Sequence, residues 1–92
     1  MLKVTVVEQE GRATFKVEGR LVKPWVSELK KSWTQFVREH PEEPVMVDLG
    51  EVTFIDHEGK CLLSSMFRKG ADLCGGGFLT RSIVDLIKNG RK

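Results

Sequence analysis

Residues 48–63 read DLGEVTFIDHEGKCLL, a stretch in which strand-like and helix-like patterns meet. Residues 44–49 are nearly continuously apolar, which predicts a short strand that is covered on both faces. A break is expected at residues 50–51, after which residues 52–55 resume the apolar character. Asp56 then stands where its carboxylate can accept a bond from the first turn of a helix. The apolar stripe of that helix is Leu62, Leu63, Met66 and Phe67.

Two segments of alternating polar and apolar residues precede this stretch, at residues 2–6 and 13–17. Alternation with a period of two predicts two half-buried strands. The turn signal Glu10-Gly11 between them favours an antiparallel hairpin. Gly19 is expected to end or bend the second strand.

A helical pattern follows Pro24 and stops at His40-Pro41. Proline suits the first turn of a helix, where its missing N–H costs nothing. We expect Trp25 and Trp33, which both lie on the apolar stripe, to make the largest apolar contribution to the core.

The C-terminal third is expected to contain a helix stop at residues 75–77, a short last strand at residues 78–80 and a final helix over residues 82–88. The element order is therefore β-β-α-β-α-β-α. It predicts an α/β fold: one domain over residues 1–92, with a mixed sheet of about four strands and helices packed on it.

Composition and charge exclude several classes of protein. The chain has 92 residues, a formal net charge of +2 and 30% charged residues, which is not the composition of a strongly basic nucleic-acid-binding protein. No apolar run approaches the roughly 18 residues of a membrane span, and the first residues do not resemble a secretory signal. Two cysteines are too few for a disulfide framework, so we expect a cytoplasmic protein without direct membrane insertion.

The side chains that could carry chemistry are few. The run Asp56-His57-Glu58 could suggest a metal or acid–base site, but adjacent residues at a helix start point in different directions. We therefore expect a solvated capping turn, no metal and no catalytic group. Cys61 and Cys74 are interpreted as buried small residues. The glycine run at residues 75–77 lacks the partners of a phosphate loop, so no cofactor is expected.

The segment from Asp48 to Gly59 resembles the signature of STAS domains, the family of sulphate transporters and anti-sigma factor antagonists. That signature is a strand ending in Asp-Leu, two variable residues, Val-x-Phe-Ile-Asp, two hydroxyl residues and Gly, followed by an apolar helix. Gly19-Arg20-Leu21 also resembles the family pattern after its second strand. The predicted element order agrees with the family fold over nearly the whole chain.

The resemblance implies a binding module and not an enzyme. In bacterial anti-sigma factor antagonists the domain binds an anti-sigma factor, often a serine kinase, which phosphorylates a serine at the start of this helix and thereby breaks the complex. Here Glu58 occupies the phospho-acceptor position. We expect Glu58 to fix the site in one charge state, so that phosphorylation there cannot regulate binding. The alternative is that Glu58 is simply a good first-turn residue in a module whose phosphorylation site has drifted.

The expected partner surface has two parts. One is the start of this helix, from the capping residue through the first turn, and the other is the segment at the end of the second strand and the loop after it. The residues of this surface are Asp56, His57, Glu58, Gly59, Lys60, Arg20 and Lys23. The expected partner is a protein of the anti-sigma factor or serine-kinase type. The alternative is a scaffold or accessory subunit of a membrane transport or stress-signalling complex. A homodimer through the hairpin edge or the tryptophan-bearing helix stays open.

Overall fold

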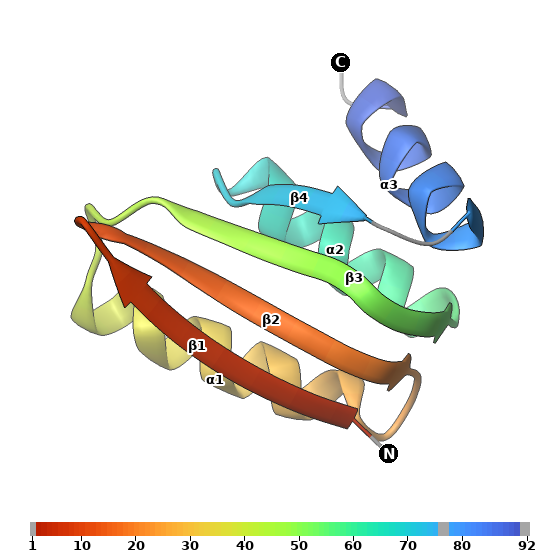
Figure 1. Ribbon diagram of the computed structural model, residues 1–92, viewed down its shortest axis with the longest axis horizontal. Helices are drawn as coiled ribbons and strands as arrows, with labels where there is room; N and C mark the ends of the chain where they lie inside the picture. The colour runs from red at the N-terminus through yellow and green to blue at the C-terminus, as the bar shows by residue number, and fades with distance from the viewer. Residues whose placement is uncertain (1, 76–77, 91–92) are drawn as a thin grey trace.

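The computed structural model describes residues 2–75 and 78–90 as a four-stranded mixed sheet with three helices (Figure 1). The predicted element order and fold class are confirmed. The elements are β1 (Leu2–Gln9), β2 (Arg12–Leu21), α1 (Val26–Glu39), β3 (Val45–Ile55), α2 (His57–Arg68), β4 (Asp72–Gly75) and α3 (Phe78–Gly90). None of the helices in the described residues is both long and apolar enough to cross a membrane.

The N-terminal hairpin forms as its sequence predicts. β1 pairs antiparallel with β2, with Val4 opposite Val17. The two turn residues have positive φ angles, 53° at Glu10 and 76° at Gly11. Positive φ at both central residues is the feature of a type I′ turn, whose twist matches that of the flanking strands.

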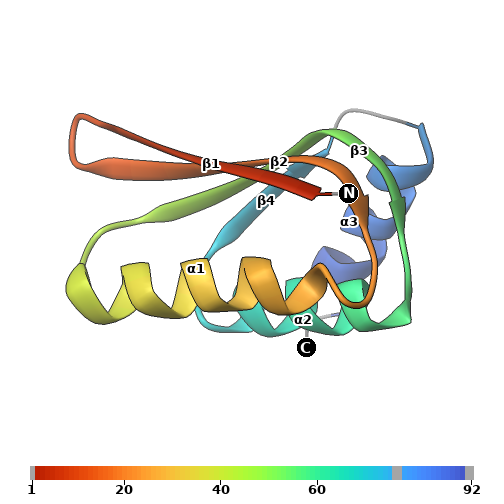
Figure 2. The same cartoon turned by 90° about the horizontal axis from the view of Figure 1, so that it is seen from below.

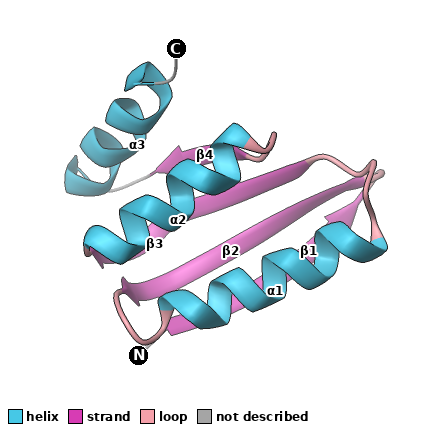
Figure 3. Ribbon diagram, turned by 180° about the vertical axis from the view of Figure 1, so that it is seen from behind, coloured by secondary structure: helices cyan, strands magenta, loops and turns pink. Residues whose placement is uncertain are grey.

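The strands lie in the order β1-β2-β3-β4, and β3 is parallel to both β2 and β4. α1 and α2 lie together on one face of the sheet, as Figures 2 and 3 show. The expectation that the central strand is covered on both faces is therefore wrong. In β3 the side chains of Val45, Val47 and Leu49 are buried beneath the helices, whereas Met46 and Asp48 are only partly buried on the other face.

The predicted break at residues 50–51 is also wrong, because β3 is one strand from Val45 to Ile55. Gly50 stays within the strand, and its N–H donates to Asp48 Oδ1 at 2.9 Å. The irregularity appears instead as shifts in the register with β2, one of them beside Gly19, whose φ is 106°. β2 and β3 curve together along this part of the sheet (Figure 2). The curvature carries their C-terminal ends over the start of α2.

The core lies between the sheet and the two covering helices. Trp33 is part of it with 6% of its surface exposed, but Trp25 is 36% exposed. The expectation that both tryptophans fill the core is wrong, because α1 begins only at Val26 and Trp25 occupies its N-cap position. The largest fully buried side chains are Phe15, Leu21, Leu29, Leu49, Leu63, Met66 and Leu73.

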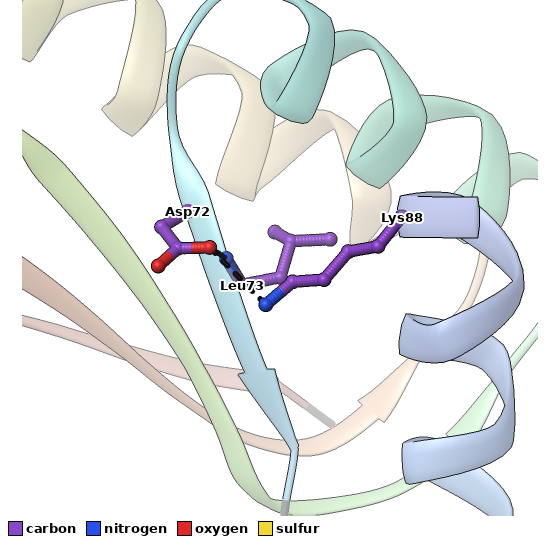
Figure 4. A network of polar contacts seen from close by, with 3 residues as sticks. All are labelled: Asp72, Leu73 and Lys88. Carbon is purple, nitrogen blue, oxygen red and sulfur yellow. Dashed lines mark hydrogen bonds and ion pairs between the residues drawn. The ribbon is translucent and has the colours of Figure 1, made fainter. Parts of the chain in front are cut away.

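The C-terminal third differs most from expectation. The last strand is β4 and not residues 78–80, which form the first turn of α3. The helix stop was expected at residues 75–77, but α2 already ends at Arg68. Residues 76 and 77 lie outside the described residues. α3 packs beside β4 and α2 (Figure 1). An ion pair of 3.2 Å between Lys88 and Asp72, drawn in Figure 4, joins α3 to β4.

Candidate functional site

The start of α2 is organised by the carboxylate of Asp56, as predicted from its N-cap position. Asp56 Oδ1 accepts a hydrogen bond from the Gly59 N–H at 2.8 Å, and Oδ2 accepts one from the Lys23 N–H at 2.9 Å. Lys23 belongs to the loop between β2 and α1, so one side chain joins two segments that are distant in sequence. The two backbone hydrogen bonds lower the pKa of the Asp56 carboxyl below its usual range.

Gly59 allows α2 to approach the end of β2. A Cβ at this position would lie 2.7 Å from the backbone oxygen of Leu21 and 2.9 Å from Ile55 Cγ2. Gly59 is buried, so it shapes the site and is not open to a partner. The Asp56 N–H donates to the same Leu21 oxygen at 3.1 Å, which fixes the turn against the sheet.

Three side chains of this turn are exposed: His57, Glu58 and Lys60. Glu58 is the acidic residue in the first turn of α2. Its carboxylate makes no hydrogen bond or ion pair with any residue of the described chain, and the Gly59 amide of the same turn donates to Asp56. Glu58 therefore presents a free negative charge at the end of the helix where the helix dipole favours an anion.

Arg20 and Lys23 complete the set of residues predicted from the sequence, and the fold brings both to the same end of the sheet. The Arg20 guanidinium lies 5.4 Å from the centroid of the Phe54 ring, an arrangement suited to a cation–π contact. Lys23 contributes its backbone N–H to Asp56 and leaves its side chain exposed.

The site also includes an apolar groove that the sequence analysis missed. It has a volume of about 490 Å³ and is bordered by the end of β3, the start of α2 and the start of α3. Phe54 contributes an exposed aromatic ring, 48% accessible, next to His57 and Lys60. The strand period contained the signal: Phe54 neighbours the buried Ile55, so it had to point away from the core. Ile83 also borders the groove. No sequence pattern indicated this position, because α3 begins at Phe78 and not at residue 82.

His57 Nε2 lies 3.5 Å from Cys61 Sγ, one helical turn further along α2. Two donor atoms are fewer than a zinc site requires. In the described part of the chain no third side chain orients the imidazole, as a thiol-based catalytic site would need. The structure thus places a thiol–imidazole pair on an exposed helix face, without a further assisting group among the residues that it describes.

Both cysteines are exposed, so the interpretation of Cys61 and Cys74 as buried small residues is wrong. Cys61 falls on the outer face of α2. Cys74 falls on the face of β4 that α1 and α2 do not cover. Partial burial and the neighbouring Asp48 carboxylate raise the pKa of the Cys74 thiol.

Comparison with known proteins identifies the fold. No family model matches the sequence. The structure is similar to the crystal structure of an anti-sigma factor antagonist from Mycobacterium paratuberculosis, with a TM-score of 0.83 and 18% sequence identity over 99% of this chain and 81% of that one. It is also similar to an uncharacterised protein of the DUF3478 family with a SpoIIAA-like fold from Shewanella loihica PV-4, with a TM-score of 0.62 and 13% identity over 97% of this chain and 79% of that one. The chain therefore has the STAS, or SpoIIAA-like, fold expected from its sequence.

Proposed function

We propose that this chain is a non-catalytic protein-binding module of the anti-sigma factor antagonist type, which binds its partner through the start of α2. The observation that carries the proposal is the exposed, unpaired carboxylate of Glu58 in the first turn of α2, the helix whose start borders the groove with the exposed ring of Phe54. The structural similarity to an anti-sigma factor antagonist supports the type of partner, a protein of the anti-sigma factor or serine-kinase class.

The surface combines an apolar centre with a charged rim. Phe54 and the groove beside it can receive or supply an aromatic or aliphatic anchor, which is the kind of contact that dominates binding energy at protein interfaces. Lys60 borders the groove, and the exposed side chains of Glu58 and Lys23 add charges of both signs at this end of the sheet. Such rim charges act mainly on the rate of association and on the choice of partner.

The charge at this position would be permanent. A phosphoserine adds about −1.5 to −2 charges and can be removed, whereas a glutamate contributes about −1 that no phosphatase removes. Residues 56–60 contain no hydroxyl group. The proposed module therefore cannot be switched by phosphorylation within this turn, and its activity would be set by the amounts of the partners.

The test is isothermal titration calorimetry of the chain with its anti-sigma factor. Glu58→Lys and Lys60→Glu each place the wrong charge at the rim and should weaken binding at least about tenfold. Glu42→Lys is a matched control, because Glu42 is also exposed but lies in the loop between α1 and β3, at the opposite end of the sheet. Unchanged affinity in both variants, with folding intact by circular dichroism, would exclude this surface.

A further inference from the structure

A second cluster of polar side chains lies at the other end of the sheet. Glu8 near the end of β1, His40 at the end of α1 and Glu43 in the loop before β3 each offer a donor atom, and these three atoms all lie within 4.8 Å of one another. His40 Nδ1 is 3.5 Å from Glu43 Oε1. The three residues come from three separate segments, so the fold itself creates the cluster.

The backbone and the core hold His40 in place. Its N–H donates to the Phe36 oxygen at 2.8 Å, and its own oxygen accepts the Glu43 N–H at 3.2 Å. The imidazole stacks on the Phe36 ring with 4.5 Å between centroids. Phe36 in turn packs edge-on against the buried Phe15. The ring that presents Nδ1 to the cluster is thus fixed before any ligand arrives, which reduces the entropy cost of binding.

The charge of the cluster is unbalanced. Two carboxylates face one imidazole, and in the described residues neither Glu8 nor Glu43 pairs with a lysine or arginine. The Glu43 side chain is only 16% exposed, so water screens its charge less than it would at an open surface. A hollow of about 420 Å³, bordered by Gly11, His40 and Glu43, leaves room for a further ligand such as water.

We infer that this cluster binds a divalent transition-metal ion of the zinc class, through Glu8, His40 and Glu43. Zn–N and Zn–O bonds of about 2.0–2.2 Å in a tetrahedral site place neighbouring donors roughly 3.4 Å apart. The observed 3.5 Å between His40 Nδ1 and Glu43 Oε1 already meets that requirement. The exposed Glu8 closes the site by a rotation of its flexible side chain. An imidazole donor favours Zn²⁺ over Mg²⁺ and Ca²⁺, which prefer oxygen ligands only.

A bound ion would join the edge strand β1 to the end of α1 and the start of β3. These segments lie at the same end of the molecule (Figure 1). Binding would therefore stabilise the folded state in proportion to the free metal concentration. The site is distinct from the proposed partner surface, so occupancy should leave partner affinity unchanged.

The first experiment titrates the full chain, without a histidine tag, with zinc chloride by calorimetry. Wild type should bind one ion. His40→Ala and Glu8→Gln should each weaken zinc binding by more than about 100-fold, which exceeds the loss expected for a residue that only orients a metal ligand. The Glu8 side chain is exposed, so Glu8→Gln should fold even if His40→Ala does not. His57→Ala is the matched control, because His57 forms the other donor pair, with Cys61, and this variant should bind as wild type does.

A second experiment replaces zinc with Co²⁺ and records the absorption spectrum from the near ultraviolet through the visible. Nitrogen and oxygen ligands alone should give no thiolate-to-metal charge-transfer band. A thiolate band, or loss of binding in His57→Ala, would place the metal at Cys61 and overturn the inference. Full zinc affinity in both His40→Ala and Glu8→Gln would overturn it as well, and so would the absence of any zinc binding by wild type.

Discussion

The carboxylate of Asp56 holds the backbone N–H of Lys23, 33 positions earlier in the chain, through a hydrogen bond of 2.9 Å. The same carboxylate caps α2 at Gly59. The loop after β2 and the start of α2 are therefore positioned by one ionised group, and the geometry of the candidate surface depends on its charge.

Replacing Asp56 with asparagine should lower the melting temperature at pH 7. Asparagine can still accept the Gly59 N–H, but its NH₂ group cannot accept the Lys23 N–H. The folded-state pKa of Asp56 is lowered, so its contribution is fully present above the ordinary aspartate value of about 3.9 and is lost as the pH falls through the lower folded value. Thermal melts of both proteins from pH 7 to pH 2 should show their difference disappearing in acid. A difference that stays constant over this range would contradict the role of ionisation.

Replacing Gly59 with alanine should destabilise the fold. The new Cβ would meet the Leu21 backbone oxygen at 2.7 Å, and a backbone atom cannot move aside as a side chain can. Overpacking of this kind costs about 1–3 kcal/mol. Urea denaturation measures the effect, with Gly50→Ala as the control, since the nearest atom there is a flexible carboxylate oxygen of Asp48 at 3.1 Å. Equal stability of the two variants would show that the close approach of α2 to β2 is not tight.

Truncating Trp33 should lower the free energy of unfolding far more than truncating Trp25. Trp33→Ala removes a side chain that is 6% exposed and should cost about 3–5 kcal/mol of unfolding free energy. Trp25→Ala removes one that is 36% exposed and should cost much less. Denaturation followed by circular dichroism tests both. If Trp25→Ala proved as costly as Trp33→Ala, the position of Trp25 before the first turn of α1 would be wrong.

The Cys74 thiol should react slowly with alkylating agents in spite of its exposure. Its raised pKa leaves less thiolate at neutral pH, and the thiolate is the reactive form. Iodoacetamide labelling, followed by mass spectrometry of the peptide that contains Cys74, should give a lower rate than free cysteine at the same pH. Labelling faster than free cysteine would contradict the raised pKa.

Local signals in the sequence predicted the parts of the fold that local chemistry determines. The hairpin of β1 and β2, the turn at Glu10-Gly11 and the cap at Asp56 each depend on neighbours in the chain, and all three are confirmed. The short strand β4 was missed because its four residues, Asp72–Gly75, give too brief a pattern to identify. The exposure of one sheet face was missed because an apolar run alone does not report how many helices cover a strand.

One candidate site could likewise be predicted from neighbouring residues in the sequence, whereas the other depends on the fold. A contiguous motif predicted the turn around Glu58. The resemblance of Gly19-Arg20-Leu21 to the family pattern predicted that the neighbouring loop belongs to the same surface. The cluster of Glu8, His40 and Glu43 depends on where the hairpin lies over the end of α1. No spacing in the sequence predicts that contact, so only the structure could bring these side chains together.

The fixed charge of Glu58 is tested most directly by incubating the complex of this chain and its serine-kinase anti-sigma factor with ATP. Wild type should stay bound and carry no phosphate within residues 56–65, whereas a Glu58→Ser variant should be phosphorylated at residue 58 and released. Mass spectrometry and calorimetry of the same samples record both outcomes. Release of the wild type with phosphate at Ser64 or Ser65 would show that the switch persists at another residue and would contradict the account.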